Sequence, residues 1–136
     1  MKKLFVLLLL SVSFSSFGQA VNPAVTIKNS IDTLINAGTV TSPILVVTPA
    51  STLTFQVVVT KISGTVGGSV ALQGSLDGVN YFAISGASNL TLTDVASQKN
   101  LWILTGANYS YYRLLSTGSG TMRALVVAKY LHRKNF

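Results

Sequence analysis

The chain has 136 residues, of which ten are Lys or Arg, three are Asp, one is His and none is Glu or Cys. This length corresponds to one domain, and the lack of Cys excludes thiol nucleophiles, thiolate metal clusters and disulfide bonds. One imidazole and three carboxylates are too few titratable groups for most acid–base catalysis, so we expect a non-enzymatic protein that uses no cofactor and no metal.

The first twenty residues have the pattern of a secretory signal peptide. A Lys-Lys pair precedes an apolar run at residues 4–14, and Gly18 and Ala20 offer two cleavage positions. The run is much shorter than the roughly 20 residues that span a bilayer. We therefore expect cleavage after Gly18 or Ala20 rather than a transmembrane helix, with a buried N-terminal segment as the alternative. The pattern predicts an exported domain over residues 21–136, located in the periplasm, at the cell surface or outside the cell.

Apolar and polar residues alternate along most of the remaining chain, as is typical of half-buried β-strands. The chain contains 37 Val, Ile and Thr residues, which favour pleated sheets. Short strands at this spacing predict an all-β fold, a single antiparallel β-sandwich or jelly roll. The strands that we expect are, in chain order, Ala24–Lys28, Ile31–Ile35, Ile44–Val47, Thr52–Thr60, Ser69–Leu76, Tyr81–Ile84, Leu90–Thr93, Leu101–Thr105, Tyr109–Leu115 and Thr121–Leu131.

Glycine-rich links join two pairs of these strands. The sequence Ser-Gly-Thr-Val-Gly-Gly at residues 63–68 separates Thr52–Thr60 from Ser69–Leu76, and we expect these two strands to form a hairpin. The sequence Thr-Gly-Ser-Gly at residues 117–120 joins the last two strands, for which we also expect a hairpin. The last strand is apolar on both faces, so we place it centrally in its sheet.

Positive charge is concentrated near the end of the chain. The net charge is +7 for the full chain and +5 without the two N-terminal lysines, and Lys129, Arg133 and Lys134 lie in or beside the last strand. A nucleic-acid-binding domain gathers its basic groups on one folded face, so we expect no nucleic-acid partner. The cationic end favours acidic surfaces such as lipid headgroups or anionic polysaccharide.

The few titratable residues are expected to have structural roles. Asp77 precedes a glycine in an Asp-Gly turn, and Asp32 and Asp94 lie in or at the ends of strands. A calcium site built on Asp77 and Asn80 is the alternative for the first of these. His132 lies among cations near the chain end, so we expect it to be exposed.

The aromatic residues supply the candidate binding site. Trp102, Tyr109, Tyr111 and Tyr112 fall within eleven residues, and alternation along a strand places Tyr109, Tyr111 and Arg113 on one face and Tyr112 on the other. Exposed aromatic rings stack on sugar rings and on protein partners. We therefore predict binding residues Trp102, Tyr109, Tyr111 and Arg113, with ordinary packing between strands as the alternative.

Two segments, residues 63–84 and 111–134, together resemble small β-sandwich structural proteins of bacteriophages and prophages. The resemblance covers about a third of the chain and consists of a turn motif and a C-terminal two-strand motif. The turn motif is Gly74, Ser75, Asp77, Gly78, Asn80 and Tyr81. The C-terminal motif is Tyr111, Tyr112, Arg113, Leu114, Gly118, Gly120 and Thr121. The resemblance implies a non-enzymatic component of a virus particle.

These observations leave two hypotheses for function. The first is a structural module of the virion surface, if the protein is phage-encoded, with copies of itself or other structural proteins as partners. The second is an exported cell-surface or periplasmic protein for binding or adhesion, with glycans as a possible ligand class.

Overall fold

The computed structural model describes residues 25–47, 51–106 and 108–134, so the expected signal peptide lies outside the described residues. In the described residues no helix is long and apolar enough to cross a membrane. The chain forms ten strands in these ranges. They are β1 (Val25–Ile35), β2 (Thr39–Thr41), β3 (Leu45–Val46), β4 (Ser51–Gly64), β5 (Gly68–Ser75), β6 (Phe82–Ala83), β7 (Leu90–Leu92), β8 (Ser97–Thr105), β9 (Tyr111–Gly118) and β10 (Met122–Lys134).

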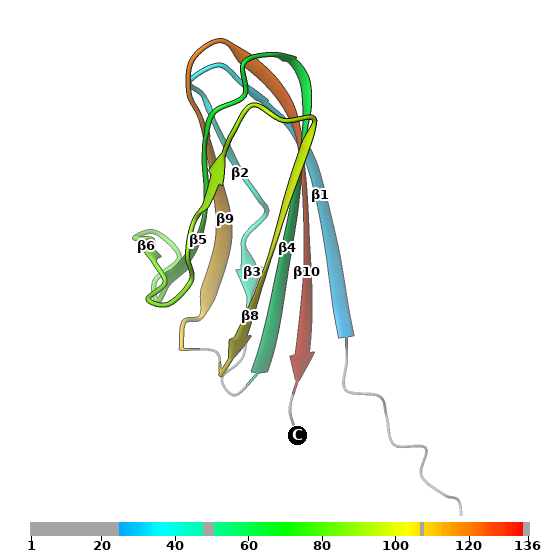
Figure 1. Cartoon of the computed structure of the whole chain (residues 1–136). Helices are drawn as coiled ribbons and strands as arrows, with labels where there is room; N and C mark the ends of the chain where they lie inside the picture. The colour runs from blue at the N-terminus through cyan, green and yellow to red at the C-terminus, as the bar shows by residue number, and fades with distance from the viewer. Residues whose placement is uncertain (1–24, 48–50, 107, 135–136) are drawn as a thin grey trace, which may run out of the picture.

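The strands form two antiparallel sheets that pack face to face (Figure 1). The four-stranded sheet has the order β1-β10-β4-β8. The six-stranded sheet has the order β2-β9-β5-β6, with β3 also paired to β9 and β7 to β5. The predicted all-β sandwich is therefore confirmed, and so is the central position of the last strand, because β10 lies between β1 and β4.

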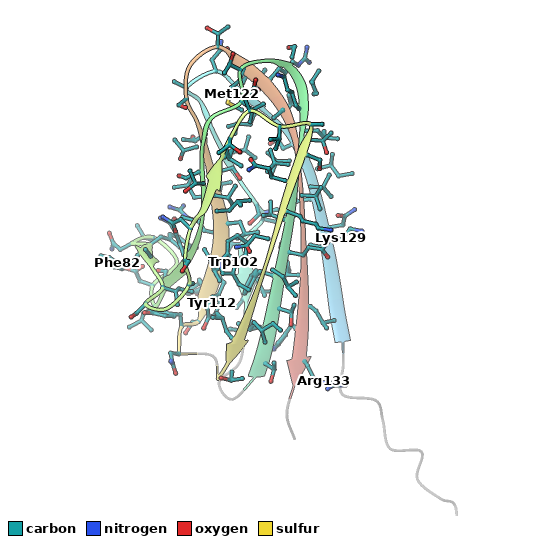
Figure 2. The ribbon with its side chains drawn as sticks, viewed as in Figure 1. Phe82, Trp102, Tyr112, Met122, Lys129 and Arg133 are labelled. Atoms are coloured by element: carbon teal, nitrogen blue, oxygen red, sulfur yellow. The ribbon has the colours of Figure 1, made fainter. Side chains whose placement is uncertain are left out.

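Alternation along the strands builds one core between the sheets. In β4 the buried side chains are Leu53, Phe55, Val57 and Val59, and the even-numbered residues of β10 from Met122 to His132 are also buried. Figure 2 shows Trp102 and Tyr112 between the two layers. Each fully buried large apolar side chain contributes roughly 1.5–3 kcal/mol, which explains how the fold holds without disulfide bonds.

Three aromatic rings of this core pack against one another, toward the end of the sandwich away from the two glycine-rich links. The ring of Phe55 lies 5.8 Å from that of Tyr112 and 5.9 Å from that of Tyr130, measured between centroids, with tilted planes. The Tyr130 hydroxyl donates a hydrogen bond of 2.8 Å to the Pro43 carbonyl. The contacts join β4 and β10 of one sheet to β9 of the other, so the rings hold the two layers together.

The two glycine-rich links do not close hairpins, and that prediction was wrong. β4 pairs with β10 and β8, whereas β5 pairs with β9, β6 and β7, so the link from β4 to β5 crosses between the sheets. The link from β9 to β10 crosses in the same way. Glycine is common in hairpin turns, but it also allows two backbones to approach closely. In these links the glycines allow the close approach and do not form a hairpin turn.

The two crossing links lie against each other at one end of the sandwich, seen at the top of Figure 1. The Thr65 amide donates a 3.0 Å hydrogen bond to the Thr121 carbonyl, and the Ser119 amide donates a 3.1 Å bond to the Gly67 carbonyl. A Cβ atom on Gly64 would collide with the Thr121 carbonyl oxygen. The glycines therefore allow the links to pair backbone to backbone.

The N-terminal strand and one short strand also differ from expectation. The two segments expected at Ala24–Lys28 and Ile31–Ile35 form one strand, because Asn29 and Ser30 also pair with β10. Ala24 itself lies outside the described residues. β2 was not predicted, because its only apolar residue, Val40, lies between two threonines and shows no alternation.

We predict that Gly64→Ala lowers the free energy of unfolding by about 2–4 kcal/mol. The residue has φ 74°, which costs an alanine about 1–2 kcal/mol, and the clash with Thr121 adds a further cost. Gly86→Ala is the matched control, because Gly86 has φ 83° but no atom beyond its two chain neighbours lies within 4 Å of the place that its Cβ would take. Urea unfolding of both variants measures the difference, and equal losses would contradict a tight crossing.

Candidate interaction surfaces

The three carboxylates lie in separate places, and each is engaged locally. Asp94 accepts hydrogen bonds of 2.8 Å from Lys61 Nζ and from the Val66 amide, and the Lys61 bond in particular holds the pKa of Asp94 below its usual value. Asp32 accepts a 2.7 Å bond from the Thr33 amide. Among the described residues no three His, Cys, Asp or Glu side chains gather in a group that could hold a metal ion.

Asp77 organises the loop that follows β5. Its Oδ1 accepts 2.8 Å hydrogen bonds from the Val79 and Asn80 amides and from the Ser75 hydroxyl, and its Oδ2 accepts a 2.7 Å bond from Asn80 Nδ2. These donors, the Asn80 amide first, hold the pKa of Asp77 far below its ordinary value. The turn role predicted for Asp77 thus has a clear structural basis.

The same loop presents three exposed apolar side chains. Leu76, Val79 and Phe82 are 71 %, 78 % and 67 % exposed, and Figure 2 shows Phe82 projecting away from the sandwich. We call residues 75–82 the Asp77 loop. The loop displays apolar groups on a backbone that five hydrogen bonds around Ser75 and Asp77 keep in shape. Our sequence reasoning missed this feature, although apolar residues beside an Asp-Gly turn were a visible signal.

His132 is buried, with 5 % of its surface exposed, so the expectation of an exposed residue was wrong. β10 continues through Lys134, and His132 pairs with Leu53 in the register of β10 and β4. It therefore follows the alternation of β10 and points to the core side. The cation that follows it, Arg133, points the other way.

Trp102 lies in the core. It is 6 % exposed, and its Nε1 donates a 2.8 Å hydrogen bond to the Ser88 carbonyl. That bond ties β8 to the loop before β7. In this position the indole offers almost no surface for stacking on a ligand.

The other predicted binding residues divide between two faces. Tyr112 is in the core, and Tyr111 and Arg113 alternate with it along β9, as expected. Tyr109 precedes β9 and packs inward instead, with its ring edge-on to that of Tyr112 at 5.8 Å between centroids. A Cβ on Gly74 would lie 2.6 Å from the Tyr109 ring, so the glycine makes the space that the ring occupies.

Tyr111 and Arg113 form a small cluster on the outer face of the six-stranded sheet. The Arg113 guanidinium lies 3.9 Å from the centroid of the Tyr81 ring, and its Nε donates a 2.8 Å bond to Gln73 Oε1. The Tyr111 ring lies beside Gly78 of the Asp77 loop. The structure thus brings Tyr111 and Arg113 close to this loop, while a binding role for the four predicted residues stays a prediction.

A cleft of about 280 Å³ opens beside Tyr109, near the ends of β8 and β9. Its lining mixes apolar residues such as Ile84 and Ile103 with the polar residues Ser85, Thr105 and Asn108. None of the three carboxylates lines it. The cleft therefore supplies contact surface without the acid–base groups that hydrolysis of a bound sugar needs.

Both edges of the four-stranded sheet are long. β1 has 11 residues and β8 has 9, and in the described part of the chain no strand pairs with the outer side of either. Near these edges, Ile31, Leu101 and Ile103 are 63 %, 54 % and 62 % exposed. Long, unprotected edge strands with exposed apolar residues are sites where another chain can pair.

We predict that the Asp77 loop keeps its shape on acidification until well below the ordinary aspartate pKa. A lowered pKa in the folded state stabilises the loop above the ordinary value near 4, and that contribution is lost as the pH falls through the folded value. In NMR spectra, the Val79 and Asn80 amide signals should therefore begin to shift only in strong acid, whereas Asp77→Asn should shift them at neutral pH. A midpoint near pH 4 in the unaltered protein would contradict this account.

The chain has similar proteins among solved structures, but none among family models or curated proteins. No family model matches the chain, and no curated protein matches it. Among solved structures, the chain is similar to one from work described as "Bacillus endospore appendages form a novel family of disulfide-linked pili". The TM-score is 0.43 at 10 % identity, over 84 % of this chain and 94 % of that chain. No functional conclusion follows from a likeness of this size.

Proposed function

We propose that the protein is a non-catalytic structural module of an exterior surface, whose copies assemble through the two open edges of the four-stranded sheet. The observation that carries the proposal is the pair of long edge strands, β1 and β8. The local engagement of Asp32, Asp77 and Asp94 supports a role without acid–base chemistry. The signal-peptide pattern of the first twenty residues supports export.

The directions of the edge strands favour assembly in a row. The three strand pairs of the sheet are all antiparallel, so with four strands β1 and β8 run in opposite directions. A second copy, displaced along the sheet without rotation, therefore brings its β1 antiparallel to the β8 of the first. Contacts between two different patches of the same chain continue into an open fibre when successive copies are related by a displacement that does not close a ring.

The strand register indicates which residues meet at such a contact. Asn29, Lys129, Gln56 and Leu101 form one row across the outer face of the sheet. If this row continues into the next copy, Leu101 of one copy lies opposite Asn29 of its neighbour. A slip of two residues in register brings other residues of the same face together.

We predict that mixing Asn29→Cys and Leu101→Cys proteins under oxidising conditions yields a disulfide between the two variants. The natural chain has no Cys, so each bond reports only the introduced thiols, and paired edge positions lie within disulfide reach. Differently tagged variants separate mixed products from products of one variant with itself on a non-reducing gel.

Gln56→Cys is the matched control, because Gln56 is exposed in the same row but lies on the central strand β4. It should form no cross-link above the level expected for random collision. If each variant formed disulfides mainly with other copies of itself, the contact would be that of a two-fold dimer and not that of a row. A monomer in analytical ultracentrifugation, without mixed products, would overturn self-assembly.

We predict that peptide mass spectrometry finds the protein in the cell envelope or the medium with an N-terminus at Gln19 or Val21. These starts correspond to cleavage after Gly18 or Ala20. Enrichment in purified virus particles with Met1 retained would instead favour the virion hypothesis and remove the argument for export. The cross-linking result does not depend on this outcome, so location and assembly are tested separately.

A further inference from the structure

The outer face of the four-stranded sheet combines cations with aliphatic side chains. In β4 and β10 the residues on this face alternate with buried ones, and the strand register places their partners in β1 and β8 on the same face. Its cations are Lys99, Arg123, Lys129 and Arg133. Its large apolar residues are Ile31, Ile35, Val58, Leu101, Ile103, Leu125, Val127 and Leu131. Figure 2 shows Lys129 and Arg133 on the side of the sheet away from the core.

None of the three aspartate side chains neutralises these cations from the same face. Asp32 pairs with Val126, which is buried, so its side chain lies on the opposite side of the sheet. Asp77 belongs to the loop after β5, and Asp94 is bonded to Lys61 and the Val66 amide. The face is therefore positive, and a face-to-face contact with a second copy would bring like charges together.

The apolar residues of the face are exposed or half-buried and lie between the cations. In the row that crosses the sheet, Lys129, Gln56 and Leu101 are neighbours on β10, β4 and β8. One shallow depression is lined by residues that include Lys129, Leu131 and Leu101, and a second by Gln56, Lys99 and Leu101. Each depression is thus lined by a lysine and by at least one aliphatic residue.

The chemistry of the face distinguishes between anionic partners. An acidic polysaccharide needs only the cations of the face, and it would leave the aliphatic groups between them in water. The described aromatic residues of this sheet, Phe55, Trp102 and Tyr130, on which sugar rings could stack, are all buried. At a bilayer surface, by contrast, cations attract the headgroups while aliphatic groups enter the boundary with the acyl chains. We propose that this face docks on an anionic lipid bilayer. The face belongs to a single copy, so the proposal does not require assembly.

Co-sedimentation with vesicles tests the proposal. The protein is used as purified from cells, and binding is compared between vesicles of mixed phosphatidylglycerol and phosphatidylcholine and vesicles of phosphatidylcholine alone. We expect binding to the anionic vesicles, weakened by added NaCl. The double variant Lys99→Gln, Lys129→Gln should bind about 25-fold more weakly, at about fivefold for each cation lost. Leu101→Ser with Ile103→Ser should also weaken binding, by about tenfold.

Two control variants make the same change in net charge, or in exposed apolar groups, at positions outside this face. Asn89→Asp with Thr65→Glu lowers the net charge by the same amount at exposed positions outside this face, and should bind nearly as the unaltered protein does. Leu76→Ser with Val79→Ser removes comparable exposed apolar groups from the Asp77 loop, and should also leave binding unchanged.

Three outcomes would overturn the proposal. Equal binding by all variants would assign it to another part of the chain, including the apolar N-terminal run. Equal binding to both kinds of vesicle would remove the role of charge. Loss of binding in the lysine variant but not in the Leu101 and Ile103 variant, with equal competition by a soluble polyanion, would show a purely electrostatic site for acidic polymers.

Discussion

The arrangement of the two sheets depends on the close approach of the two glycine-rich links, residues 63–68 and 117–120, where they cross between the layers. β4 and β10 are neighbours in one sheet, and the links that join them to β5 and β9 lie side by side. Because Gly64 leaves room for the Thr121 carbonyl, β5 and β9 emerge as neighbours in the second sheet. One crossing thereby positions the central strands of both layers. The aromatic contacts of Phe55, Tyr112 and Tyr130 then form where those central strands face each other.

The features that could be predicted from the sequence are those that depend on local patterns of residues. Alternation of apolar residues identified most strands and the fold class, and the two-sided apolar character of β10 identified its central place. The partners of each strand depend on contacts between distant residues, so the glycine-rich links were misread as hairpins. The same limit explains His132 and Tyr109. His132 is buried because β10 extends farther than expected, and Tyr109 turns inward because Gly74 on another strand leaves space for its ring.

The candidate surfaces were harder to predict for a related reason. Exposure depends on which strands lie at an edge and which face is covered, and neither property is encoded in a short segment. Trp102 therefore could be recognised as an aromatic residue but not as a core residue. The cationic end of the chain was visible in the sequence. The placement of these cations on the same face as Leu101 and Lys99 was not visible, because it depends on the pairing of β4 with both β10 and β8.

The even number of strands in the four-stranded sheet has a consequence for any row of copies. Such a row is polar, because one end presents β1 and the other presents β8, and the two strands differ in sequence. Asp32 lies on the first and Lys99 on the second. In a row built as proposed above, the two ends would therefore offer different edges to an incoming copy. An anchoring protein that recognises one edge would set the orientation of the whole row while leaving the other end free to elongate.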